Sequence, residues 1–282
     1  MSPVRPPEGA TPGRAPPPPG PPNLHRLLLT ATVAAALATP AAHAGRPCEA
    51  KPIEVDAITK GMALAQRTAA ALERSGAQVL VLARAGQDLS KYGLRYSHLG
   101  FAYRDGEHWR VLHKLNHCGT ADSALYRQGL GEFFMDSPFR YEAALVPLTP
   151  NLQARLLPIL QDNARAAQLN ERRYNMLAYP WSTAYQQSNQ WAIETLAMAA
   201  ADPSANTRPA AQLWLQQHGY QPTTLRLGLL TRLGARVTAA NVAFDDHPDA
   251  LRFSDRINTV TVDSVFDWLT RSGLGTAATT VR

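Results

Sequence analysis

Two histidines in neighbouring predicted strands have the spacing that acid–base chemistry requires. Asp105-Gly106 lies between two strand-like segments and is a strong signal for a two-residue hairpin loop. With these two residues as the loop, His98 lies directly opposite His113, and both side chains point to the same face. Directly paired residues have Cβ atoms about 4.5–5.5 Å apart, so we expect the two imidazoles to touch.

An imidazole pair of this kind is suited to general base catalysis. One ring accepts a proton while the other fixes its tautomer and orientation through a hydrogen bond. The alternative is a cross-strand polar pair with no chemical role, because many folds contain such pairs. A third interpretation adds His117 and Cys118 as metal ligands, but adjacent histidine and cysteine fit no standard zinc spacing. We therefore predict no metal and no cofactor.

Ser188 stands where a nucleophile would be activated. A predicted helix begins near Ser188 and ends near Ala201. Free N–H groups and the positive end of the helix dipole could stabilise an oxyanion at its start. The alternative is that Ser188 or Asn189 is an ordinary N-cap, because serine and asparagine are preferred caps. The residue types alone favour the cap.

Two further groups of residues allow a binding role. Asp245, Asp246 and His247 concentrate carboxylates and an imidazole, which could bind a divalent ion or cap a cleft. A turn before Pro248 is the ordinary explanation. Trp181 lies in a predicted loop, where it could pack against the core or stack on a ligand.

The elements that must position these residues mix helices with antiparallel strands. Thr149 as N-cap and Pro150 as first helical residue open a helix that runs to about Asn170. The chain after Cys118 is loop-like and aromatic. This mixture predicts an α+β fold with an antiparallel sheet and packed helices. The other expected helices are 58–74, 189–201, 209–218 and 264–270, and the expected strands are 78–83, 94–104, 108–115, 143–147, 241–244 and 259–262.

Residues 1–44 have the features of an export leader. A Pro-rich start is followed by Arg26, an apolar run at 27–38 and the A-x-A sequence of residues 42–44. This order is typical of a cleaved signal peptide, and the apolar run is too short to span a bilayer stably. We predict that the mature chain begins at Gly45 and works in the periplasm or outside the cell, with no stable membrane span.

Composition limits the partners of the mature chain. The whole chain has a net charge of +6, and loss of the leader's three arginines and one glutamate lowers it to +4. Because there is no run of Lys or Arg, we predict no nucleic-acid binding. Cys48 and Cys118 both remain after cleavage, and in an oxidising compartment we expect a disulfide between them. We divide the mature chain into a core domain, 45–205, and a C-terminal α/β extension packed on it, 206–282.

Three short motifs resemble a known family. S-H-L-G-F around His98, V-L-H ending at His113 and Y-x-x-S-N-Q-W around Ser188 are similar to motifs of permuted NlpC-type, papain-like cysteine hydrolases. This resemblance covers about residues 58–198 and implies a papain-like fold in permuted order. Residues 48–269 also resemble a set of secreted bacterial proteins catalogued as domain of unknown function 2145.

The hydrolase resemblance implies roles for individual residues. His98 matches the general base, His113 the residue that orients it, and Ser188 the nucleophile. That family has cysteine at the nucleophile position, and a serine there needs its proton removed during attack and a well-formed oxyanion hole. Either the protein is a serine variant that hydrolyses amides or esters or transfers acyl groups, or its cleft only binds. The expected cleft-lining residues are Tyr96, Trp181, Tyr185 and Asn189.

The resemblance also implies a substrate class, the peptide stems of the cell wall or another envelope substrate. Besides the hydrolase and the binding module, the protein could be a structural envelope protein whose histidines are merely packed, because a fold does not fix a function. The relative positions of Ser188 and His98 in the folded chain distinguish the hydrolase from the other two functions.

Overall fold

The computed structural model describes residues 53–135 and 138–282. The predicted signal peptide, its cleavage site after Ala44 and Cys48 lie outside the described residues. The leader and the disulfide between Cys48 and Cys118 therefore stay predictions. Within the described part of the chain, no helix is both long and apolar enough to cross a bilayer.

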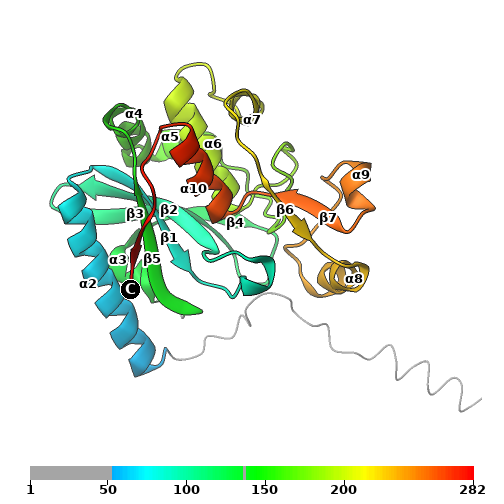
Figure 1. Ribbon diagram of the computed structural model, residues 1–282, viewed down its shortest axis with the longest axis horizontal. Coiled ribbons are helices and arrows are strands. Elements are labelled where there is room, and N and C mark those ends of the chain that lie inside the picture. The colour runs from blue at the N-terminus through cyan, green and yellow to red at the C-terminus, as the bar shows by residue number, and fades with distance from the viewer. Residues whose placement is uncertain (1–52, 136–137) are drawn as a thin grey trace, which may run out of the picture. The chain divides into compact units, whose positions relative to one another are not determined.

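A six-stranded antiparallel sheet forms the centre of the described chain (Figure 1). Its strand order is β4-β3-β2-β1-β5-β8, and every neighbouring pair runs antiparallel. The predicted α+β class with an antiparallel sheet is confirmed. The strands are β1 (Val79–Ala85), β2 (His98–Asp105), β3 (His108–Asn116), β4 (Ser123–Gly129), β5 (Arg140–Pro147) and β8 (Thr279–Val281).

Helices cover both faces of this sheet, which we call the α2 face and the α6 face (Figure 1). All seven residues of β1 are buried, and alternate ones belong to the two faces. Val79 and Val81 pack on the α6 face, whereas Leu80 and Leu82 pack on the α2 face. A strand covered on both sides is apolar along its whole length. α2 (Val55–Ser75) and α3 (Leu130–Phe134) cover the first face, and α4 (Pro150–Gln161), α6 (Ser188–Ala201) and α10 (Val262–Arg271) cover the second.

The single helix predicted from Pro150 to about Asn170 is wrong in its second half. α4 ends at Gln161, and the next residue, Asp162, has an extended backbone. The Asp162 side chain accepts hydrogen bonds from two N–H groups that follow it, and this cap begins a short second helix, α5 (Asn163–Ala167). An aspartate that satisfies free N–H groups favours a new helix start over continuation of the old helix.

β4 and α3 were not expected, because the chain after Cys118 was predicted to be loop-like. β4 is an edge strand of the sheet, and most of its residues are only partly buried. Its sequence, S-A-L-Y-R-Q-G, is therefore half polar and lacks the apolar run of a central strand. Pairing with β3 along its whole length makes it a strand.

The hairpin between β2 and β3 forms, but its predicted register is wrong. Asp105 pairs with His108, so the loop residues are Gly106 and Glu107 rather than Asp105 and Gly106. Gly106 has φ 61°, and both favoured hairpin turns need a positive φ at the first loop position. The glycine therefore takes the first loop position instead of the second, and every cross-strand partner shifts by two residues.

The segment 206–282 contributes to two parts of the described chain. β6 (Thr223–Arg226) and β7 (Arg256–Thr259) form a separate antiparallel ribbon, with α8 (Leu229–Thr238) and α9 (Asp249–Arg252) at its outer end (Figure 1). α7 (Arg208–Gln217) packs against α6, α10 joins the core on the α6 face, and β8 pairs with β5.

Two strands predicted in this segment need correction. Residues 241–244 are not a strand, because the backbone of Ala243 forms hydrogen bonds with the Asn175 side chain and not with a neighbouring strand. The strand predicted at 259–262 ends at Thr259. Thr261 forms a capping box with Ser264 instead, and α10 begins directly after it.

Candidate functional site

His98 and His113 form the hydrogen-bonded pair that the sequence predicts. His98 Nε2 lies 2.8 Å from His113 Nδ1, and the rings meet edge to face. They are diagonal neighbours rather than direct partners, because continuation of the ladder puts Gly100 opposite His113. A Cβ atom at Gly100 would lie 2.7 Å from His113 Cβ and 2.9 Å from the Leu112 carbonyl oxygen. Glycine in the S-H-L-G-F motif therefore leaves the space in which His113 reaches His98.

A chain of polar side chains fixes the tautomers of both rings. Gln128 Nε2 donates to Glu132 Oε1 at 3.0 Å, so Gln128 Oε1 faces His113 Nε2, 2.7 Å away. His113 must then carry its proton on Nε2 and accept at Nδ1. His98 donates from Nε2, which leaves a lone pair on its Nδ1. Within the described residues, this nitrogen forms no hydrogen bond, and the His98 side chain is partly exposed.

Burial keeps both imidazoles neutral. It lowers the pKa of His113 to about 3, and the positive charge of Arg84 acts in the same direction. Burial likewise holds the pKa of His98 well below its ordinary value, with Arg84 again the second cause. The Arg84 guanidinium lies 4.8 Å from the centre of the Phe133 ring, which also contacts both histidines. The pair is thus a neutral base with a fixed tautomer.

Ser188 is the first residue of α6 but not its cap. The N-cap is Gln187, whose side chain accepts a hydrogen bond from the Asn189 N–H. The alternative that Ser188 or Asn189 caps the helix is therefore wrong. Ser188 is 5% exposed, and its hydroxyl lies 3.3 Å from the Tyr174 hydroxyl. Burial raises the pKa of Tyr174, so this partner is a neutral phenol and not a base.

The structure does not bring Ser188 together with the two histidines. The His98 ring contacts Phe133 on the α2 face, whereas α6 packs on the opposite face. Asn189 Oδ1 accepts a hydrogen bond from the Leu99 N–H at 3.1 Å and so fastens the start of α6 to β2. Within the described residues, neither imidazole forms a hydrogen bond with the Ser188 hydroxyl.

The residues expected to line a cleft lie apart from one another. Tyr96 is buried in the core on the α6 face, near the Phe266 ring, with its hydroxyl 3.3 Å from Thr280 Oγ1. Trp181 packs against the ring of Tyr220. The Tyr185 hydroxyl donates to Asp245 Oδ2, and Asn189 is committed to β2. The structure therefore gives no support for one cleft lined by these four residues.

Asp246 and His247 join two loops. Asp246 Oδ2 accepts from the Tyr179 N–H at 2.7 Å, and Asp246 Oδ1 lies 3.0 Å from His247 Nδ1. His247 Nε2 donates to the Asn258 carbonyl oxygen, so both of its nitrogens are engaged. Among the described residues no group of three or more His, Cys, Asp or Glu side chains could hold a metal ion. This segment fastens the ribbon to the loop before α6.

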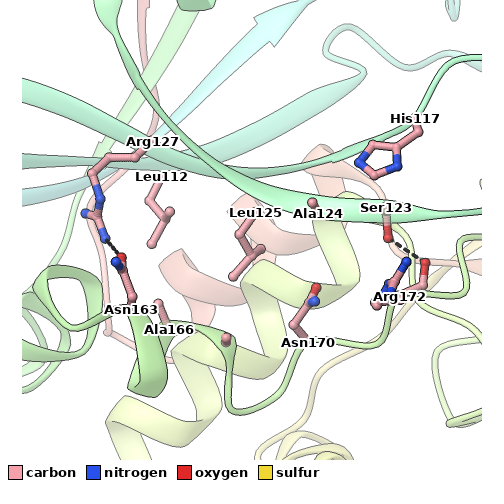
Figure 2. Close-up of a pocket in the computed structure, with 11 residues that line it drawn as sticks. Leu112, His117, Ser123, Ala124, Leu125, Arg127, Asn163, Ala166, Asn170 and Arg172 are labelled. Atoms are coloured by element: carbon pink, nitrogen blue, oxygen red, sulfur yellow. Dashed lines mark hydrogen bonds between the residues drawn. The ribbon is translucent and has the colours of Figure 1, made fainter.

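A pocket lies on the α6 face between β3, β4 and α5 (Figure 2). Its volume is about 440 Å³, within the range of small-molecule sites. Figure 2 shows Arg127 and Asn163 at one end, His117 and Arg172 at the other, and apolar side chains between them. No Asp or Glu is among the described residues that line it. The lining residues are Leu112, His117, Ser123, Ala124, Leu125, Arg127, Asn163, Ala166, Ala167, Asn170 and Arg172.

Arg127 carries the least compensated charge of this pocket. Its guanidinium donates to the Leu160 carbonyl oxygen at 2.8 Å and to Asn163 Oδ1 at 2.9 Å, both neutral acceptors. It also lies 5.3 Å from the centre of the Tyr103 ring. Within the described residues it forms no ion pair, and burial lowers its pKa. A partly desolvated guanidinium without a carboxylate partner is a binding group for an anion.

A buried polar network holds the far wall of the pocket. Lys114 Nζ donates to Asn170 Oδ1 at 2.9 Å and to Gln186 Oε1 at 2.8 Å, and burial lowers the pKa of Lys114 to about 7. Gln186 in turn donates to Glu194, which also pairs with Arg208 at 2.8 Å. These contacts tie the loop that carries Asn170 to α6 and α7.

Sequence reasoning missed this pocket because two of its walls were not predicted. Arg127 comes from β4 and Asn163 from α5, elements that the pattern did not reveal. The one signal for the start of α5 was Asp162-Asn163, because aspartate and asparagine are preferred N-cap residues.

The fold and the site define a mixed α+β protein with a packed histidine pair and a cationic pocket. The chain belongs to a bacterial family described as "Uncharacterized protein conserved in bacteria (DUF2145)", whose model matches residues 71–269. The predicted membership of this family is confirmed. The chain matches no curated protein and no solved structure.

Proposed function

We propose that this protein is a non-catalytic binding protein of the bacterial cell envelope, built on a permuted papain-like, NlpC-type fold. Its ligand is a small anionic molecule held in the pocket between β3, β4 and α5. The observation that carries this proposal is the Arg127 guanidinium, which faces the pocket with only neutral hydrogen-bond partners.

The shape of the pocket supports a short peptide with a free carboxylate as ligand class. Arg127 at one end binds the carboxylate, and Leu112, Leu125 and Ala166 beside it accept a small apolar side chain. Asn170 at the other end is partly exposed and offers its side-chain amide nitrogen to a peptide carbonyl, since among the described residues only its Oδ1 is engaged, by Lys114. This chemistry agrees with the cell-wall peptides that the hydrolase resemblance implies.

The position of Ser188 argues against a covalent hydrolase. A serine nucleophile needs a base within hydrogen-bond reach to remove its proton. The Ser188 hydroxyl is buried against a phenol, and the histidine pair belongs to the opposite face of the sheet.

Titration calorimetry with two matched peptides tests the binding proposal. We expect the full chain to bind tri-alanine with its free carboxylate and not tri-alanine amide. Loss of the charged hydrogen bonds in Arg127→Gln should cost about 1.5–3 kcal/mol, or roughly tenfold to a hundredfold in affinity. Arg155→Gln is the control, because Arg155 is an exposed arginine that also donates to a carbonyl oxygen.

Two results would contradict the proposal. One is the absence of any carboxylate-dependent binding, and the other is equal binding by Arg127→Gln and the unchanged chain. The urea midpoint of each variant separates loss of binding from loss of folding.

A hydrolase remains the second candidate, favoured by the hydrogen-bond chain from Glu132 to His98. In that case His98 Nδ1 removes a proton from water as the water oxygen attacks the carbonyl carbon of an amide or ester. The C–N or C–O bond of the tetrahedral intermediate then breaks, and the leaving amine or alcohol takes the proton from His98. A fluorophosphonate probe distinguishes this from a serine hydrolase. Labelling that disappears in Ser188→Ala would establish a nucleophilic serine and overturn the binding proposal. We expect no such labelling.

A further inference from the structure

Three leucines of helix α8 lie on its outer side. Leu229, Leu230 and Leu233 are 81%, 83% and 60% exposed. Arg232 of the same helix points inward: it is 7% exposed, and its guanidinium lies 4.4 Å from the centre of the Phe244 ring. A surface helix normally buries its leucines and exposes its arginines. The reversed arrangement indicates that the outer face of α8 is a contact surface.

Phe253, at the end of α9, belongs to the same region. Its side chain is 79% exposed. Arg232 donates to the carbonyl oxygens of Leu251, at 3.4 Å, and Ser254, so the end of α9 is fastened to α8. Figure 1 shows both helices at the outer end of the β6–β7 ribbon.

Two exposed arginines stand beside these apolar residues. Arg226 and Arg256 are direct partners across the β6–β7 ribbon, and like charges in such a pair destabilise a sheet. Asp255 lies 3.9 Å from Arg256, in a pair that is exposed on both sides. Within the described residues, Arg226 forms no ion pair. Arg226 is therefore available to an anionic partner, and Arg256 can also contact one because its exposed pair with Asp255 is weak.

We propose that this region docks on an anionic membrane surface. We call it the α8–α9 surface and define it by Leu229, Leu230, Leu233, Phe253, Arg226 and Arg256. The arginines contact lipid phosphates, and the leucines and Phe253 enter the headgroup boundary, as in other helices that lie in the membrane interface. This proposal is independent of the ligand pocket.

The paired arginines favour lipid over a second copy of the chain. A symmetric dimer through this surface would bring two such arginine pairs to one interface, where like charges repel. A layer of lipid phosphates compensates all of them.

Cosedimentation of the full chain with vesicles tests the proposal. We expect binding to vesicles of phosphatidylglycerol and phosphatidylcholine, and much weaker binding to phosphatidylcholine alone. Each arginine near an anionic surface raises partitioning about fivefold, so Arg226→Gln with Arg256→Gln should lower it about twenty-five-fold. Leu229→Ser with Leu230→Ser should lower it roughly tenfold, because burial of these side chains is lost.

Matched controls isolate this surface. Leu213→Ser changes another exposed leucine, at 54%, and Arg155→Gln another exposed arginine. The apolar segment 27–38 is common to all variants, so its own affinity for lipid cancels in the comparison. The substituted side chains are exposed, which leaves folding unaffected.

Three results would overturn the proposal. They are equal sedimentation of all variants, equal binding to neutral and anionic vesicles, and self-association in solution that the leucine substitutions abolish. The last result would assign the surface to a second copy of the chain.

Discussion

His113 is completely buried, and both of its ring nitrogens have a hydrogen-bond partner, one on β2 and one on β4. The tautomer of His98 thus depends on Gln128 and Glu132, although neither forms a hydrogen bond with it. Gly100 supplies the space for this contact. At the scale of single residues, packing of the histidine pair explains why the motif has glycine two residues after His98. This explanation holds whether or not the pair acts on a substrate.

The neutral state of His113 predicts how stability depends on pH. Its pKa is about 3 in the folded chain and about 6.5 when unfolded, so the unfolded chain binds the proton more tightly. Stability from this group is complete above about pH 6.5 and falls as the pH drops toward 3. At pH 5 the loss amounts to about 2 kcal/mol.

Urea denaturation at pH 7.5 and pH 5.0 measures this loss. In His113→Gln the decrease between the two pH values should be about 2 kcal/mol smaller than in the unchanged chain. His98→Gln gives a second reading at a partly exposed position, and His117→Gln, at an exposed histidine, is the control. An unchanged pH dependence in both of the first two variants would show that the pair is not neutral.

Between elements, the carboxylate of Glu194 in α6 forms a buried polar connection. It is fully buried and accepts hydrogen bonds from Gln186, Gln190, Arg208 and Gln212, which join α6 to α7 and to the loop before it. A buried pair of this kind contributes little net stability while intact. Removal of one partner leaves the other charge uncompensated.

Glu194→Gln is therefore expected to destabilise the fold by about 3 kcal/mol or more, because the Arg208 charge remains buried. Addition of Arg208→Met should restore part of this loss. The measurement is the urea midpoint at neutral pH. Asp56→Asn, in an exposed pair with Lys60, should change the urea midpoint far less, because water screens that pair. Equal losses in the Glu194 single and double variants would refute the coupling.

The sequence predicts well the elements in which the spacing of apolar residues directly indicates the buried side chains. The helix 58–74 and the strands beside Asp105-Gly106 have regular apolar spacing and clear turn signals, and they form close to the predicted bounds. β4 is half polar, β8 is very short, and α8 turns its leucines outward, so none of them shows the pattern of a core element.

The apolar pattern likewise predicts one part of the candidate site and not the other. Alternation along a strand reveals that His98 and His113 share a face, and this part is confirmed by their 2.8 Å hydrogen bond. The pattern does not reveal which face a distant helix covers. Residues of β1 are apolar on both sides, so nothing in the strand indicates that α6 and Ser188 belong opposite the histidines.

At the scale of the whole molecule, residues 279–281 close one edge of the main sheet. β8 pairs with Ala143, Ala144 and Leu145 of β5 and forms the last strand of the main sheet. Next to it, Glu142 accepts hydrogen bonds from Arg95 and Arg282, and the bond with Arg95 is the main cause that lowers its pKa to about 2. The family model ends at residue 269, so this strand lies beyond the matched segment.

Truncation after Ala278 should expose the edge of β5. At roughly 1 kcal/mol for each lost hydrogen bond, we expect a loss of about 2–3 kcal/mol in the free energy of unfolding. An exposed strand edge also pairs with other chains, so the truncated protein should self-associate as its concentration rises. Urea denaturation and sedimentation velocity measure the two effects. Arg282→Gln keeps the strand and removes only an exposed guanidinium, 72% accessible, so it should cost less than about 1 kcal/mol. A truncated chain as stable and monomeric as the full one would mean that β5 needs no partner at this edge, and that the matched segment folds without the end of the chain.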